Sequence, residues 1–82
     1  MLHKEIFAIR VKKLRKANGE QQKDLAEAIG ATQATISDIE NGRKATSFDR
    51  LAEICKHYNV SADYLLGLTD EPRPLVQQEK EG

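Results

Sequence analysis

The chain has 82 residues, a formal net charge of zero, 39% hydrophobic residues and a single cysteine, Cys55. A chain of this length supports one small hydrophobic core, which argues against a large enzyme with a deep catalytic pocket. No apolar run is long enough to span a membrane and residues 1–14 lack a signal-peptide pattern, so we expect a cytoplasmic protein in which Cys55 is a small buried hydrophobic residue.

The first predicted helix covers residues 4–17. Phe7, Val11 and Leu14 recur on one helical face, and the Asn-Gly pair that follows Ala17 is a typical stop signal. The basic residues of this segment are interpreted as its solvated side, because an amphipathic helix needs a polar face. They are Lys12, Lys13, Arg15 and Lys16.

Residues 22–41 are the most informative segment of the chain. Apolar residues are spaced i, i+4 in residues 22–29 and i, i+3 in the segment after Thr32, a typical N-cap. Gly30 lies between the two patterns and suits the left-handed conformation that often ends a helix, and an Asn-Gly pair at 41–42 ends the second pattern. This order predicts a helix-turn-helix, whose second helix is a rigid rod that fits the major groove of DNA.

Two more helices follow. Residues 48–58 are predicted to form a helix capped by Thr46 or Ser47, and a short helix is predicted to begin at Ser61 and end before Gly67. No segment has the alternating pattern of a strand, so the predicted fold class is all-α with five helices. The predicted core stripe of the longer helix consists of Phe48, Leu51, Ile54, Cys55 and Tyr58.

The last residues differ in composition from the rest. Residues 69–82 contain two prolines together with charged and amide side chains, too polar to build a core of their own. We therefore expect one domain at residues 1–68 and a flexible polar tail at residues 69–82.

The charges are unevenly distributed along the chain. Residues 1–44 carry nine basic and six acidic side chains, a net charge of +3, whereas residues 45–82 carry four basic and seven acidic side chains, a net charge of −3. The half that contains the helix-turn-helix is therefore the basic half. This asymmetry suggests one face turned toward an anion, although so small an imbalance is also compatible with ordinary solvated surface.

Three segments together resemble the phage-repressor-like helix-turn-helix family, which includes the Cro and cI repressors and is often called the XRE family. The segments are FAIRVKKLRKANG, QKDLAEAIGATQATISDIENGRKAT and FDRLAEICKHYNVSADYLLG, and the similarity spans about residues 7–68. Glu20 and Gln21 depart from the family pattern at the start of the second helix, and Asn59 replaces the usual glycine.

The resemblance implies a compact five-helix, lambda-repressor-like domain that binds double-stranded operator DNA as a homodimer. It also implies a transcriptional regulator, most often a repressor, of bacterial, phage or mobile-element origin, with no cofactor or metal. Candidate dimer surfaces are Tyr64 with Leu68, or the stripe of Leu2, Ile6 and Ile9.

In this family the exposed N-terminal part of the helix after Thr32 contacts base edges. Gln33 is the main candidate, because its amide can donate to and accept from one adenine, while Ala34 suits a thymine methyl group and Asp38 a cytosine amino group. The alternative for each residue other than Gln33 is a simple solvated helix surface. The full set is Gln33, Ala34, Thr35, Ser37 and Asp38.

Phosphate contacts are expected from amides, hydroxyls and basic side chains around the same helices. The resemblance implies that Gln22 binds a phosphate and braces Gln33, and a purely solubilising role is the alternative for Arg43 and Lys44. The full set is Gln22, Lys23, Thr32, Asn41, Arg43 and Lys44. The resemblance further implies a partly buried salt bridge between Arg10 and Glu40.

A protein-interaction module is the main alternative, since antitoxins and adaptor proteins use the same fold to bind a protein partner. The zero net charge and Asp38 favour this alternative. An enzyme or a metal site is not expected, because His3 and His57 are the only histidines and neither has a nucleophile or a ligand set at a motif spacing.

Overall fold

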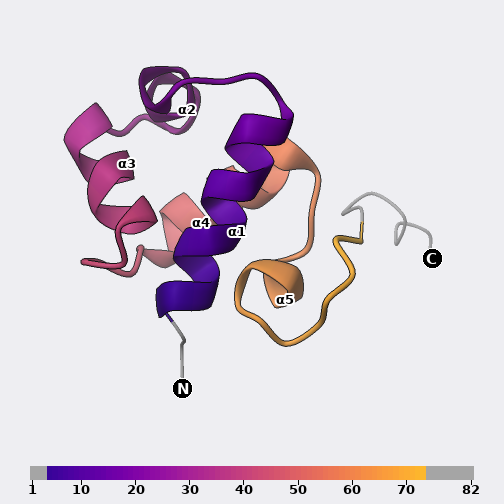
Figure 1. Ribbon diagram of the computed structural model, residues 1–82. Coiled ribbons are helices and arrows are strands. Elements are labelled where there is room, and N and C mark those ends of the chain that lie inside the picture. Colours follow the sequence, from indigo (N-terminus) through magenta and orange to yellow (C-terminus); the bar gives the residue numbers. More distant parts are fainter. Residues whose placement is uncertain (1–3, 74–82) are drawn as a thin grey trace.

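The computed structural model describes residues 4–73, so the predictions that fall on Leu2 and on residues 74–82 lie outside the described residues. Within residues 4–73 the chain forms five helices and no strand, which confirms the predicted all-α fold. The helices are α1 (Lys4–Ala17), α2 (Gln22–Ile29), α3 (Gln33–Glu40), α4 (Phe48–Tyr58) and α5 (Ala62–Leu65), as Figure 1 shows.

Helix α1 runs through the middle of the domain, and the other helices pack around it. In Figure 1, α2 and α3 lie on one side of α1, α5 lies on the other side, and α4 crosses behind. Helix α3 contacts both α1 and α2, while α5 contacts α1 and α4. None of the helices within residues 4–73 has the length and apolar character needed to cross a membrane.

The core lies where the apolar faces of all five helices meet. Each fully buried aliphatic or aromatic side chain contributes about 1.5–3 kcal/mol relative to an exposed one, so this small set supplies the main driving force for folding. The side chains with essentially no exposed surface are Phe7, Val11, Leu25, Ile36, Ile39, Ile54 and Leu65. Cys55 is also buried, as predicted, and burial raises the pKa of its thiol.

The turn between α2 and α3 fixes the angle of the helix-turn-helix. Gly30 has φ +71°, the left-handed conformation predicted for this position, and its N–H bonds the carbonyl of Ala26. The side chain of Thr32 then caps α3 by accepting a hydrogen bond from the N–H of Thr35 at 3.1 Å. Glycine and the cap thus set where α2 ends and α3 begins.

The prediction that Phe48 belongs to the core is wrong. Phe48 is 90% exposed, although Leu51 and Tyr58 of the same stripe are packed against the core. Phe48 is the first residue of α4, directly after the N-cap Ser47. Because the Cα–Cβ bonds of a helix tilt toward its N-terminus, the first side chain projects past the end of the packed face.

Candidate nucleic-acid interface

Helix α3 buries one face in the core and exposes the other face to solvent. Ile36 and Ile39 are buried in the core, whereas Gln33 and Ala34, at the start of the helix, are exposed. The amide of Gln33 makes no hydrogen bond to another residue within 4–73. This side chain therefore keeps both a donor and an acceptor available to an external partner.

The other predicted base-reading residues of α3 are half-buried and already have local partners. The hydroxyl of Thr35 lies 3.0 Å from that of Thr32, and the hydroxyl of Ser37 lies 3.2 Å from Nδ2 of Asn41. Both hydroxyls belong to short-range contacts at the two ends of α3. Gln33 and Ala34 are thus the side chains of α3 that are free to reach outward.

The predicted salt bridge between Arg10 and Glu40 is wrong, and Arg15 takes the place of Arg10. Nε and Nη2 of Arg15 lie 2.6 Å and 3.0 Å from the two carboxylate oxygens of Glu40. Their side chains are only 10% and 2% exposed, and the bonds to Glu40 raise the pKa of the Arg15 guanidinium. This bidentate salt bridge connects α1 to the last turn of α3.

Arg10 cannot reach Glu40, because five residues turn a helix through about 140° beyond one full turn, so Arg10 and Arg15 lie on different faces of α1. Arg10 instead donates to the carbonyls of Tyr64 and Thr69 at 2.6 Å and 2.5 Å, and its Nη2 lies 2.8 Å from Asp70. Its guanidinium also stacks over the Tyr64 ring, 4.4 Å from the centroid.

Gln22 extends the Arg15–Glu40 pair toward the surface. It is the first residue of α2, and its Nε2 donates to Oε1 of Glu40 at 3.3 Å. Gln22 is therefore held by the end of α3, and its predicted bracing of Gln33 on DNA stays a prediction. The carboxylate of Glu40 therefore links α1, α2 and α3 at one point.

Asp38 neutralises part of the basic loop that follows α3. Its carboxylate oxygens lie 3.3 Å from Nη1 of Arg43 and 3.5 Å from Nζ of Lys44. The side chains of both cations remain 66% exposed, while that of Asp38 is 26% exposed. The two cations are therefore held close to the exposed side of α3 but stay accessible to solvent.

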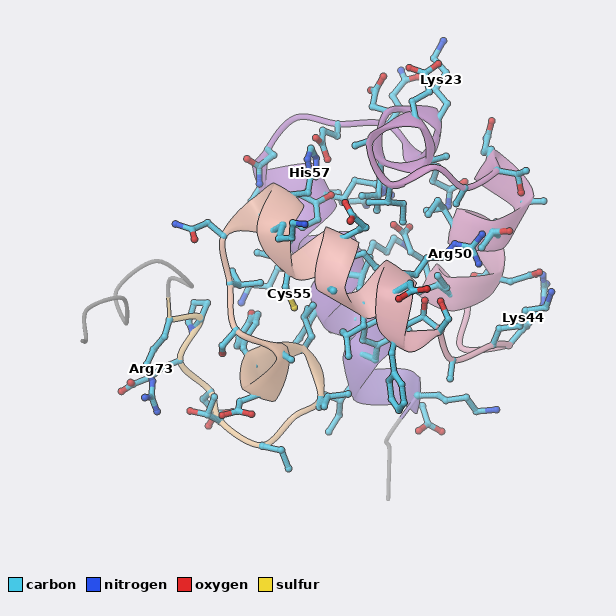
Figure 2. All side chains as sticks on the ribbon, turned by 180° about the vertical axis from the view of Figure 1, so that it is seen from behind. Lys23, Lys44, Arg50, Cys55, His57 and Arg73 are labelled. Atoms are coloured by element: carbon cyan, nitrogen blue, oxygen red, sulfur yellow. The ribbon has the colours of Figure 1, made fainter. Side chains whose placement is uncertain are left out.

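The positions of the other predicted phosphate contacts complete this surface. Lys23 is exposed on the first turn of α2, Thr32 caps α3, and Asn41 follows its last residue. Figure 2 shows Lys23 and Lys44 at the two ends of one edge of the domain, with α3 between them. Cationic side chains thus flank the exposed face of α3.

A second polar cluster, not predicted from the sequence, joins the loop after α1 to the end of α4. Glu20 lies 2.6 Å from Nε2 of His57 and accepts a hydrogen bond of 2.6 Å from the Tyr58 hydroxyl. Burial and this bond to Glu20 raise the pKa of Tyr58. The backbone carbonyl of Glu20 also accepts a hydrogen bond from Arg15, so the cluster supports the residue that holds Glu40.

Within the part of the chain that the structure describes, no group of three or more His, Cys, Asp or Glu side chains could hold a metal ion.

A helix-turn-helix whose second helix is exposed and flanked by cations defines a class of DNA-binding domains. Residues 11–65 match the family described as helix-turn-helix, and the chain belongs to this family, the Cro/cI-type or XRE helix-turn-helix proteins. This result confirms the resemblance drawn from the three sequence segments.

Individual proteins agree with this assignment. The chain is 37% identical over 73 residues to the HTH-type transcriptional regulator YobD of Bacillus subtilis, a match that covers 89% of this chain and 65% of YobD. The chain therefore spans slightly less than two thirds of the length of that relative. Such relatives are named as transcriptional regulators and not as enzymes.

The fold also resembles solved structures. The N-terminal DNA-binding domain of SinR from Bacillus subtilis is 31% identical with a TM-score of 0.71, and the match covers 78% of this chain and 93% of that domain. The P22 c2 repressor, in a complex with synthetic operator 9T, is 27% identical with a TM-score of 0.71, over 73% of this chain and 91% of the other.

Proposed function

We propose that this protein is a sequence-specific regulator of transcription that binds a palindromic DNA operator as a homodimer, with α3 in the major groove. The observation that carries the proposal is the free amide of Gln33 on an exposed helix whose other end is fixed by Arg15 and Gln22 through Glu40. A helix held rigidly at one end can present its first turn to base edges in a constant orientation. The similarity to the P22 c2 repressor supports repression as the mode of regulation.

In this proposal Gln33 reads an adenine through N6 and N7, and Ala34 packs against a thymine methyl group. The side chains of Thr35, Ser37 and Asp38 are half-buried, and in this proposal they contact bases only after breaking the contacts with their local partners. Base reading thus rests mainly on the first two residues of α3.

Phosphate binding is assigned to the groups on either side of α3. The amide of Gln22 and the hydroxyl of Thr32 lie at the first residue of α2 and at the cap of α3, where backbone N–H groups also attract phosphates. Lys23, Arg43 and Lys44 supply charge. Asn41 positions the loop through its bond to Ser37. A regulator of this kind would act on DNA in the cytoplasm.

The salt dependence of duplex binding tests the proposal. Three cations from each copy give about six phosphate contacts in a dimer, so the logarithm of the binding constant should fall with the logarithm of salt concentration with a slope of about −5. Arg43→Ala removes one cation from each copy and should reduce the slope by about 2. Lys56→Ala, on the exposed side of α4, is the matched control and should leave the slope unchanged. A slope near zero would contradict DNA binding.

The alternative is a protein-interaction module, and the pairing of Asp38 with Arg43 and Lys44 favours it, because it lowers the positive charge beside α3. A module of this type would bind duplexes weakly and with little dependence on salt. The same titration therefore separates the two functions.

A further inference from the structure

Glu20 lies in the loop between α1 and α2 and has a partner at each of its carboxylate oxygens. Its side chain is only 19% exposed, and a carboxylate so sheltered from water needs polar partners. Both partners come from the last turn of α4. The Tyr58 hydroxyl donates to Oε1 at 2.6 Å, and Nε2 of His57 lies 2.6 Å from Oε2. The side chain of Glu20 therefore joins the loop to the end of α4.

The backbone of the same residue is bound to α1. Its N–H donates to the carbonyl of Arg15 at 3.1 Å, and its carbonyl accepts a hydrogen bond from Nη1 of Arg15 at 2.7 Å. Glu20 is thus held by α1 through its backbone and by α4 through its side chain. Figure 2 shows His57 beside this loop and Lys23 on the outer side of α2, into which the loop leads. Because the two anchors meet at one residue, the loop has little freedom to shift.

The residues that follow Glu20 begin the helix that carries Gln22 and Lys23. Only Gln21, the N-cap of α2, separates Glu20 from Gln22. The N–H of Gln21 donates to the carboxylate of Asp24 at 2.8 Å, which connects the cap to the first turn of α2. Consecutive Cα atoms are about 3.8 Å apart, so Gln22 cannot move far while Glu20 stays in place. The anchors of Glu20 therefore also fix the start of α2.

A second route leads from Glu20 to Gln22 through side chains. Arg15, which donates to the Glu20 carbonyl, also forms the buried salt bridge with Glu40. Glu40 in turn accepts a hydrogen bond from Nε2 of Gln22 at 3.3 Å. Together with the backbone of residues 20–22, these contacts form a closed ring. Because a ring constrains each of its members, a shift of Glu20 would also turn the amide of Gln22.

We propose that Glu20 is a positioning residue for DNA binding, which holds the amide of Gln22 and the first N–H groups of α2 where they meet a phosphate. This inference rests on the proposed function, because Gln22 is assigned to a phosphate there. Glu20 itself contacts no DNA in this account, since its carboxylate is bound to the end of α4. Misplacement of the Gln22 amide loses a hydrogen bond to a charged group, which should weaken binding by about tenfold.

A merely structural role of Glu20 would lower the stability of the fold without changing the affinity of the folded protein. Two variants separate these roles, because Glu20→Gln and Glu20→Leu remove the same charge. Glutamine keeps polar atoms that can bond to Tyr58 and His57, whereas leucine fills a similar space without any. Glu53→Leu, the same substitution on the exposed side of α4, is the matched control.

The test is fluorescence anisotropy with a duplex selected from a random library, under conditions in which circular dichroism shows each variant to be folded. Glu20→Leu should bind about tenfold more weakly than Glu20→Gln, and Glu53→Leu should bind like the original chain. Equal affinities of the two Glu20 variants would overturn the inference. Should Glu20→Leu not fold, Tyr58→Phe replaces it, because it removes one bond and keeps the charge of Glu20. An affinity of Tyr58→Phe equal to that of the original chain would then overturn the inference.

A double-mutant cycle measures whether the effect passes through Gln22. In a Gln22→Ala background, Glu20→Leu should bind no more than about threefold more weakly than Glu20→Gln, since the amide that it misplaces is absent. In a Gln33→Ala background the difference should stay at about tenfold, because Gln33 is not a member of the ring. A difference of about tenfold in both backgrounds would contradict a route through Gln22.

A measurement without DNA distinguishes the failure of this inference from the failure of the proposed function. The side-chain amide signal of Gln22 in nuclear magnetic resonance should keep its position in Glu20→Gln and shift in Glu20→Leu. If this pattern is observed but no duplex is bound, the proposed function fails and the positioning of Gln22 by Glu20 stands. If a duplex is bound but the Gln22 signal is the same in both variants, the inference fails and DNA binding stands.

Discussion

Arg15 and Glu40 form a buried bidentate salt bridge that joins α1 to the last residue of α3. The carboxylate of Glu40 is 2% exposed, so nearly all of its stabilisation comes from Arg15 and from the amide of Gln22. The orientation of α3 is thus set by a residue of α1 that lies outside the helix-turn-helix. We expect the stability of the fold and the geometry of DNA binding to depend on the same pair.

Arg15→Ala should lower the free energy of unfolding by about 3–5 kcal/mol, because it leaves the carboxylate of Glu40 buried without a cationic partner. Urea denaturation followed by circular dichroism measures this change. The double variant Arg15→Ala with Glu40→Gln should recover part of the loss, since the buried charge is then removed as well. Equal stability of Arg15→Ala and the original chain would show that the pair does not hold α3.

Arg10→Ala should have a smaller effect, about 1–2 kcal/mol, because the lost contacts are hydrogen bonds to two carbonyls and stacking on Tyr64. Asp70→Ala should change stability by less than about 0.5 kcal/mol, because the Asp70 side chain is 97% exposed and its ion pair is screened by water. The same urea titration compares the two variants. An Asp70→Ala loss as large as that of Arg10→Ala would contradict this ranking.

Asp38→Asn should strengthen binding to duplexes of any sequence, by roughly threefold to tenfold at low salt, because it frees Arg43 and Lys44 and removes a negative charge beside α3. Fluorescence anisotropy with an unrelated duplex and with a selected duplex measures both affinities. Glu53→Gln, an equal charge change on the exposed side of α4, is the control. A loss of binding confined to the selected duplex would instead assign base reading to Asp38.

The free energy of unfolding should fall as the pH rises above about 10. The pKa of Tyr58 is raised from its ordinary value of 10.0 in the folded chain by burial and by the bond to Glu20. Above the ordinary pKa of 10.0 the unfolded chain releases the phenol proton, while the folded chain keeps it. Rising pH therefore favours unfolding, by up to about 1.4 kcal/mol per pH unit.

Urea titrations between about pH 8 and pH 11 measure this decline, because that range brackets the ordinary pKa of a phenol. Tyr58→Phe should make the decline shallower, and the raised pKa of the Cys55 thiol should account for part of what remains. A slope in Tyr58→Phe equal to that of the original chain would assign the decline to other groups.

The helix boundaries could be predicted because they depend on local signals. Gly30 ends α2, Thr32 caps α3 and Ser47 caps α4, and each acts on residues within one turn of itself. Arg15 was also within reach of sequence reasoning, since it follows Val11 by four positions and therefore lies on the core face of α1. The charge of Arg15 led to its assignment to the solvated side.

Other features depend on tertiary packing and have no local signal. Glu20, His57 and Tyr58 are brought together by the way the loop after α1 meets the end of α4, 37 positions further along the chain. Phe48 has the spacing of a core residue, but the packed face of α4 ends before its side chain. Its exposure could be seen only once the neighbouring helices were in place.

The most direct test of the central claim is the selection of bound duplexes from a random library at near-physiological salt, with Gln33→Ala selected in parallel. We predict a palindrome whose half-sites are about one helical turn apart, and a loss of preference at one base of each half-site in the variant. The absence of any enriched sequence, or the same palindrome with unchanged preferences in Gln33→Ala, would contradict the account of α3 as the helix that reads DNA through Gln33.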